Sequence, residues 1–136
     1  MNKTYVLDAS ALINLLMNTP GADQIAELVR DSNRLGSPLL VSVSNWGEVF
    51  YLSWKRHGEQ AARETLSYLS RLPFRVVPVD LPQALKAGEM KVLHSIPYVD
   101  CMAAALASIH RATLVTSYRD FEKLGRHFPI LWIARA

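Results

Sequence analysis

The sequence has little of several features that mark common classes of protein. It has one cysteine, Cys101, in 136 residues, which excludes an intramolecular disulfide framework and a cysteine-based zinc cluster. We expect Cys101 to be a small buried apolar residue. The six glycines are isolated from one another, and no Gly-x-Ser-x-Gly motif occurs. The chain therefore lacks the phosphate loops of NTPases and dinucleotide enzymes and the nucleophile elbow of esterases.

Long hydrophobic runs are also missing, although 50% of the residues are hydrophobic. No segment is long enough to span a bilayer, so we expect no membrane insertion. Asp8 interrupts the first apolar stretch, which a secretory signal peptide would avoid, and this favours a cytoplasmic protein. The formal net charge of +3 comes without a dense lysine or arginine block, so it permits nucleic-acid binding without indicating it. The length predicts a single domain over residues 1–136.

Short apolar runs alternate along the chain with longer stretches that have helical periodicity. The expected strands are Thr4–Leu7, Leu39–Val43, Arg75–Val79, Leu114–Thr116 and Ile130–Ile133. The expected helices are Ala9–Met17, Ala22–Asn33, Asn45–Arg56, Glu59–Ser70, Pro82–Leu93, Pro97–His110 and a short one at Asp120–Leu124. Strands without polar alternation, separated by helices, indicate a parallel sheet buried on both faces. The pattern therefore predicts a three-layer α/β fold.

Polar residues follow the predicted strands near the point where each strand ends. They are Asp8 after the first strand, Glu48 one turn into the helix after the second, Asp80 after the third, Asp100 in the helix that Pro97 opens, and Thr116, Ser117 and Asp120 after the fourth. The carboxyl ends of parallel strands meet at one edge of a sheet, where the functional crevice of an open sheet lies. These residues are therefore the candidates for a functional site.

Each acid also has an ordinary explanation at the start of a helix. Asp8 and Asp80 are good N-cap residues. Asn45 followed three residues later by Glu48 is a capping-box pattern. Asp100 lies where a negative charge complements the helix dipole. Considered singly, each acid is explained better by capping than by a functional role.

Considered together, Asp8, Glu48 and Asp100 favour a metal site. Three carboxylates delivered to one sheet edge would repel one another, and helix N-termini supply only about half a charge each to offset this. A divalent cation removes the repulsion, and ligands that are all oxygen indicate Mg²⁺ or Mn²⁺ rather than zinc. Such a cation polarises a phosphoryl oxygen and activates water, which is nuclease or phosphatase chemistry. We expect Asp80, in contrast, to be a cap only.

Four segments of the chain resemble the motifs of one known family. Val6–Ile13, Val43–Val49 and Ile96–Ala107 each contain one of the three acids, and Leu114–Phe121 matches a final acidic motif in part. In this order and over nearly the whole length, they resemble PIN-domain proteins, most closely the VapC-type ribonuclease toxins of toxin–antitoxin pairs.

The resemblance implies a sheet of order 3-2-1-4-5 and a homodimer with a small antitoxin partner. It also implies an endoribonuclease that cleaves RNA with Mg²⁺ or Mn²⁺. Asp8, Glu48 and Asp100 match the first, second and third acids of the family and are the implied catalytic and metal-binding residues. The implied sheet order places the first, second and fourth strand ends side by side and leaves Asp80 near the sheet edge.

One position departs from the family pattern. The family often has an acid two residues after the threonine of the last motif, and here that position is Tyr118. Tyrosine is a poor ligand for a divalent metal at neutral pH, because its pKa is about 10. Asp120 matches the common Asp-Phe pair and is expected to assist the metal through water or not at all. Thr116 and Ser117 are expected to position water, a carboxylate or a phosphate.

Three functions stay open at this stage. The first is a metal-dependent endoribonuclease toxin. The second is a phosphatase or DNA nuclease on the same acidic edge, although the chain length leaves no room for an added helical arch. The third is a catalytically weak PIN module that binds an antitoxin or nucleic acid.

Two further groups of residues carry weaker expectations. Trp46, Phe50 and Trp54 share a helix face, which indicates core packing or an antitoxin-binding surface. The basic residues are scattered and are expected mostly on solvated helix faces. Arg119, with Lys86 and Lys91, is a candidate for contacts with an RNA backbone.

Overall fold

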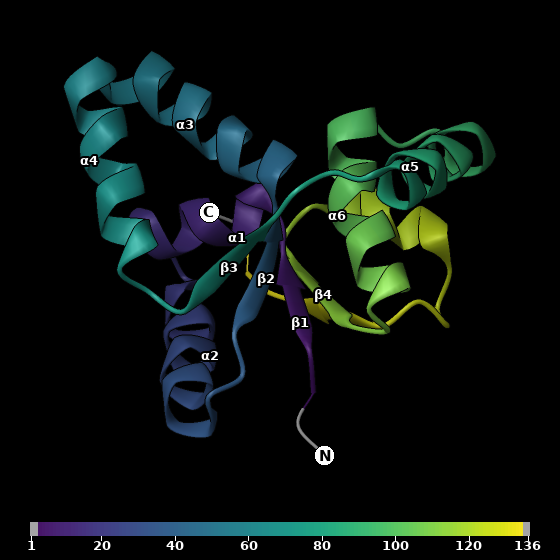
Figure 1. Ribbon diagram of the computed structural model, residues 1–136, viewed down its shortest axis with the longest axis horizontal. Helices are drawn as coiled ribbons and strands as arrows, with labels where there is room; N and C mark the ends of the chain where they lie inside the picture. The colour runs from purple at the N-terminus through teal and green to yellow at the C-terminus, as the bar shows by residue number, and fades with distance from the viewer. Residues whose placement is uncertain (1–2, 135–136) are drawn as a thin grey trace.

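The computed structural model describes residues 3–134, and its centre is a five-stranded parallel sheet (Figure 1). The strands are β1 (Tyr5–Leu7), β2 (Leu39–Ser42), β3 (Phe74–Val77), β4 (Thr113–Thr116) and β5 (Ile130–Trp132). Their order is β3-β2-β1-β4-β5, and every neighbouring pair is parallel. The predicted α/β class and the sheet order 3-2-1-4-5 are therefore confirmed.

Helices connect the strands and cover both faces of the sheet. They are α1 (Ala9–Leu16), α2 (Ala22–Leu35), α3 (Val43–His57), α4 (Glu59–Ser70), α5 (Leu81–His94), α6 (Tyr98–Ile109) and the 3₁₀ helix η1 (Arg119–Leu124). In Figure 1, α1 to α4 lie on one side of the sheet and α5 and α6 on the other. The helices α3 and α4 form a hairpin, joined at Gly58 with φ +92°.

Successive residues of a strand pack into two different apolar cores, one on each face of the sheet. Val6 and Leu114 pack with α5 and α6, whereas Leu7 and Val115 pack with α1 to α4. This follows from the period of two along a strand, because successive side chains point to opposite faces. Both faces of the sheet are buried, which explains why the strands read as continuous apolar runs.

Helix α6 packs closely on the sheet through a run of alanines. Ala103–Ala107 is buried throughout, and Cys101 one turn earlier is buried as expected. Small side chains let the helix backbone approach the strands, which places the first turn of α6 directly at the carboxyl edge of the sheet. Within residues 3–134, no single helix is long and apolar enough to cross a membrane; α5 and α6 meet the criterion only as a pair bent by 117°.

The start of α3 differs from the prediction. The helix begins at Val43 with Ser42 in the cap position, so Asn45 is inside the first turn and the predicted capping box of Asn45 and Glu48 is wrong. Asp80, in contrast, is the predicted cap: its Oδ1 accepts a hydrogen bond from the Gln83 amide at 3.0 Å. The short helix near Asp120–Leu124 is present as the 3₁₀ helix η1.

A buried polar contact between distant segments sets where α3 begins. The Ser42 hydroxyl donates to Gln83 Oε1 at 2.6 Å and also contacts the Ser44 hydroxyl at 2.9 Å. Gln83 Nε2 donates to the carbonyl of Pro78 at 3.2 Å, and Gln83 is fully buried. The side-chain amide of Gln83 therefore ties the end of β2 to the first turn of α5.

Replacing Gln83 with Ala should lower the free energy of unfolding by about 2 kcal/mol, because buried partners lose their hydrogen bonds. Urea unfolding followed by circular dichroism measures this change. Gln60→Ala on α4 is the matched control, because the Gln60 amide bonds Glu64 on an exposed face and such changes usually stay within about 0.5 kcal/mol. Equal losses in both variants would contradict a structural role for the buried amide.

Candidate active site at the carboxyl edge of the sheet

Asp8 lies at the end of the central strand and caps α1. Its Oδ1 accepts hydrogen bonds from the Ala11 amide at 3.0 Å and the Ser10 hydroxyl at 2.7 Å. Its Oδ2 accepts one from the Thr116 hydroxyl at 2.5 Å. The side chain is buried, and this burial raises its pKa, although the hydrogen bonds from Thr116, Ser10 and Ala11 oppose the shift. Asp8 is thus both a helix cap and a carboxylate held in a desolvated place.

Ser10 is a member of this cluster that the sequence analysis missed. Its hydroxyl contacts both Asp8 and Thr116 and accepts a hydrogen bond from the Ser117 amide at 3.0 Å. The Tyr118 amide donates to the Thr116 hydroxyl at 2.9 Å. Ser10 therefore joins the end of β1 to the end of β4. The Asp-x-Ser spacing at the start of the chain is the signal that could have identified it.

Glu48 is half-buried on α3 and faces the same edge. Its Oε1 accepts a hydrogen bond from Asn45 Nδ2 at 3.3 Å. Burial raises the pKa of Glu48, the Asn45 contact lowers it, and the charge of Asp8 raises it further. Asn45 Nδ2 also donates to the carbonyl of Val99 at 3.2 Å, so Asn45 links α3 to the first turn of α6. Asn45 is the second residue of the cluster that the sequence analysis did not identify.

Asp100 completes the group from the third position of α6. Its pKa is raised to about 7, first by burial and then by the charges of Glu48, Asp8 and Asp120. Asp8 and Glu48 are therefore near enough for their charges to affect Asp100. That the three acids form one catalytic or metal-binding site stays a prediction.

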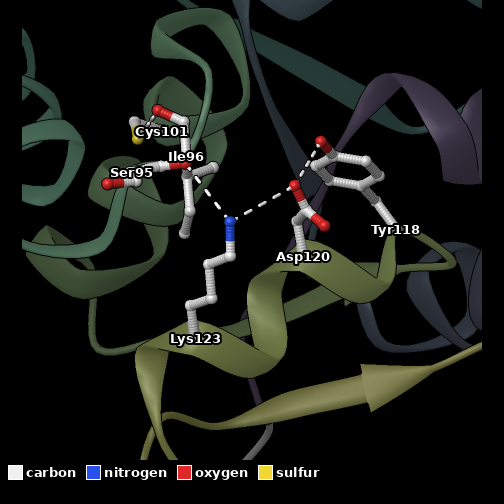
Figure 2. Close-up of polar contacts among 6 residues, drawn as sticks. All are labelled: Ser95, Ile96, Cys101, Tyr118, Asp120 and Lys123. Atoms are coloured by element: carbon white, nitrogen blue, oxygen red, sulfur yellow. Dashed lines mark hydrogen bonds and ion pairs between the residues drawn. The ribbon is translucent and has the colours of Figure 1, made fainter.

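Asp120 is near enough for its charge to raise the pKa of Asp100, and it is engaged by Tyr118 and Lys123 (Figure 2). Its Oδ2 accepts a hydrogen bond from the Tyr118 hydroxyl at 2.8 Å and lies 3.7 Å from Lys123 Nζ. Lys123 also donates to the carbonyl of Ser95 at 3.4 Å. Burial and then the bond to Asp120 raise the pKa of Tyr118 to about 12, so Tyr118 remains a neutral donor at pH 7. Tyr118 thus orients Asp120 instead of adding a carboxylate.

The chemistry of the cluster fits a hard divalent cation. Its donors are carboxylate oxygens, and each of the three acids has a raised pKa, which a cation would reverse. Asn45 Oδ1 is a buried oxygen without a hydrogen-bond partner in the described structure, directly beside Glu48. Among residues 3–134, however, no three Asp, Glu, His or Cys side chains are close enough to hold an ion as they stand.

A model of the PIN domain family matches residues 5–127, so the chain belongs to the PIN domain family. No curated protein sequence matches the chain significantly. The predicted likeness to VapC-type PIN proteins is also confirmed, since solved structures of toxin–antitoxin proteins superpose on nearly the whole chain.

Three of these structures illustrate the likeness. DNA-bound VapBC from Salmonella typhimurium has a TM-score of 0.77 at 20% identity, covering 96% of this chain and 98% of that chain. A toxin–antitoxin complex from Klebsiella pneumoniae has a TM-score of 0.69 at 22% identity, covering 94% and 96%. VapC20 of Mycobacterium tuberculosis, a sarcin-ricin loop cleaving toxin, has a TM-score of 0.65 at 20% identity, covering 90% and 95%. At these identities the likeness establishes the fold alone.

The stability of the metal-free protein should fall as pH rises from about 4 to about 7. The pKa of Asp100 is raised from 3.8 to about 7 on folding, so in this range the folded state binds more protons than the unfolded state. The unfolding free energy therefore decreases with pH and levels off above about pH 7. Asp100→Asn lacks this loss and should melt higher than wild type at neutral pH.

Melting temperatures in EDTA across this pH range provide the measurement. The difference between Asp100→Asn and wild type should grow with pH, because it isolates the one carboxyl group. Asp80→Asn, at the cap of α5 outside this cluster, is the control for a change from carboxylate to amide at a helix cap. Parallel curves for Asp100→Asn and wild type would show that Asp100 is not destabilised by its neighbours.

Proposed function

We propose that this chain is a metal-dependent endoribonuclease toxin of the VapC type, acting in the cytosol and neutralised by a small antitoxin. The observation that carries the proposal is the group of Asp8, Glu48 and Asp100, which three separate elements bring to one edge of a PIN-family sheet with raised pKa values. Carboxylates this crowded are costly to the fold, and catalysis through a cation gives a reason for them.

RNA is favoured as the substrate by a similar structure and by the shape of the chain. VapC20, which shares this fold, is described as a toxin that cleaves the sarcin-ricin loop. The acidic edge also lacks any helical arch among residues 3–134 that would clamp a branched DNA. A phosphatase or a DNA nuclease on the same edge is therefore the less favoured function.

Asp8, Glu48 and Asp100 would hold a Mg²⁺ or Mn²⁺ ion, with Asp120 beside them. When bound, the ion would neutralise the scissile phosphate and activate water for attack on phosphorus. Asp8 would be kept in position by Ser10, which donates to its Oδ1, and by Thr116, which donates to its Oδ2.

The surrounding residues of the site would orient the acids and the substrate. Asn45 directs Glu48 toward α6 through its bond to Val99. Ser117 is buried, its backbone amide donates to the Ser10 hydroxyl, and its own hydroxyl would bind water or a phosphate oxygen. The roles proposed for Asn45 and Ser117 follow from their hydrogen bonds to Glu48 and to Ser10.

An antitoxin segment would bind in the groove between α1, α3 and α4. The groove has a volume of about 130 Å³, and its walls combine apolar side chains with Arg56 and His57 at the end of α3. Trp46 packs into the adjacent core, whereas Trp54 and Tyr51 are exposed on the same helix. A partner with apolar residues and an acidic end would complement this surface. In VapBC structures of the same fold, the toxin is found with its antitoxin.

A second copy of the chain would bind to the outer face of α5. Among residues 3–134 the four most exposed large apolar side chains, at 65–82% exposure, all belong to this helix: Leu81, Leu85, Val92 and Leu93. Leu81, Leu85 and Val92 form one stripe with Gly88 at its centre. Nothing lies within 4 Å of the position that a Cβ of Gly88 would take. A glycine there lets two equivalent helices approach closely, as a twofold interface requires.

Purified protein should cleave RNA with Mg²⁺ or Mn²⁺, and Asp8→Asn and Asp100→Asn should each lower the rate at least about 100-fold. Asp80→Asn is the matched control, because Asp80 has the same capping geometry outside the cluster. Gel assays of RNA cleavage with and without EDTA measure this. Mn²⁺ should also raise the melting temperature of wild type by linkage, and less so in Asp100→Asn.

Equal cleavage by wild type, Asp8→Asn and Asp100→Asn would contradict the proposed site. If wild type binds RNA but does not cleave it at any metal concentration, the chain is a catalytically weak PIN module. Tyr118 is the structural reason to consider that function, because it supplies no fourth carboxylate and holds Asp120 through its hydroxyl.

Val92→Glu should convert the proposed dimer into a monomer, because it buries a charge in the centre of a twofold apolar interface. Sedimentation velocity measures the change. Leu35→Glu at the exposed end of α2 is the control and should leave the mass unchanged. A dimer that persists in Val92→Glu would place the interface elsewhere, and an unchanged melting temperature would show that the monomer is folded.

A further inference from the structure

Arg119 has an unusual environment next to the acidic edge. Its guanidinium carbon lies over the Trp132 ring, 4.5 Å from the ring centre, in a cation–π contact. Its Nη1 lies 3.8 Å from Glu122 Oε1, and the side chain is 44% exposed. The guanidinium is therefore in contact with Trp132, within ion-pair distance of Glu122, and partly open to solvent.

The sheet register places this cation–π pair beside the candidate active site. Trp132 is the last residue of β5 and pairs with Thr116 of β4. Thr116 in turn donates its hydroxyl to Asp8. Because neighbouring strands lie about 4.8 Å apart, Trp132 is one strand away from the residue that holds Asp8. Arg119 follows Thr116 by three residues, at the start of η1. A polynucleotide with one phosphate at the acids would therefore reach Arg119 with its neighbouring nucleotide.

A cleft next to the cation–π pair provides room for that nucleotide. It has a volume of about 450 Å³, within the range of small-molecule sites, and Trp132, Phe128 and Arg126 line it. Aromatic rings combined with arginine are the usual composition of surfaces that bind single-stranded nucleic acid. The cleft is also lined by Glu122, which lies near Arg119, and it joins residues of η1 to residues of β5.

The geometry favours contact with a base over contact with a phosphate. Arginine binds phosphate through the N–H groups at the edge of its plane, and Glu122 already occupies part of that edge. The flat face of a guanidinium stacks on nucleobases, and single-stranded RNA offers unstacked bases for it. An arginine held over an indole would present such a face with less loss of side-chain entropy than a free arginine.

We propose that Arg119, supported by Trp132, stacks on the nucleobase next to the scissile phosphate and so helps to select the RNA that enters the site. The inference rests on the proposed ribonuclease function and assigns Arg119 the role of positioning the substrate. It predicts that a lysine at this position, which keeps the charge but lacks the plane, does not replace arginine.

The test compares binding of two probes in EDTA, where the metal-dependent cleavage is blocked. One probe is a short fluorescein-labelled single-stranded RNA of mixed sequence, and the other is the same ribose-phosphate backbone without bases. In anisotropy titrations, Arg119→Lys and Trp132→Leu should bind the RNA about 5- to 100-fold more weakly than wild type. Their affinity for the abasic backbone should be unchanged.

The chain offers a closely matched control in Arg63. Arg63 also lies over an aromatic ring, 5.5 Å from the centre of Phe50, and pairs with Glu59 at 2.9 Å, but it lies on α4. Arg63→Lys should bind both probes as wild type does. Melting temperatures of all variants show whether a loss of binding comes from unfolding, and Arg119→Lys, an exposed change, is the decisive variant if Trp132→Leu is unstable.

Two results would overturn the inference while leaving the ribonuclease proposal intact. In the first, Arg119→Lys binds the base-bearing RNA as wild type does. In the second, it loses affinity equally for both probes, which would make Arg119 a contact to the backbone. If wild type neither binds RNA in EDTA nor cleaves it with Mn²⁺, both proposals fail together. Cleavage by wild type with either of the first two results rejects the role of Arg119 alone.

Discussion

The burial of a carboxylate at the end of the central strand is the constraint on which the rest of this site depends. β1 lies in the middle of the sheet, so Asp8 is enclosed by the starts of helices on both faces. Hydrogen bonds from Thr116, Ser10 and the Ala11 amide lower its pKa, but desolvation is the larger effect and the pKa stays raised. These contacts tie β1 to β4, so the position of the acid and the closure of the sheet edge depend on each other.

The same constraint makes the edge costly to the stability of the fold. Asp8 raises the pKa of Glu48, and the charges of Glu48, Asp8 and Asp120 together raise the pKa of Asp100, in a place where burial already disfavours charge. Asn45 holds Glu48 and the first turn of α6 together while its own Oδ1 has no partner among the described residues. A fold selected only for stability would replace such a group with apolar residues. Acids that destabilise the metal-free protein and fit a cation are the pattern expected of a functional site.

Periodicity was enough to predict the helices and strands, while the sheet order came from the family resemblance. The role of the three acids at the strand ends stays a prediction. What periodicity could not predict are contacts between distant segments. α3 begins at Val43 because Ser42 bonds to Gln83, 41 residues away, and the local capping pattern of Asn45 is overridden. Ser10 was missed for a similar reason, since its partner at the Ser117 amide is 107 residues away. Local propensity determines where helices form, and tertiary contacts determine their first residue.

The tyrosine at the fourth position changes the charge of the edge and therefore how a nucleic acid can be held. Tyr118 is neutral, and Asp120 is paired with Lys123, so the site has less negative charge than four free carboxylates would give it. With one divalent cation bound, the acids would still give the site a net negative charge, which would repel an approaching phosphate. Electrostatic attraction between the site and an RNA backbone would then be weak. Stacking of a base on Arg119 and Trp132 does not depend on that balance, and it provides binding energy one strand away from the repulsion.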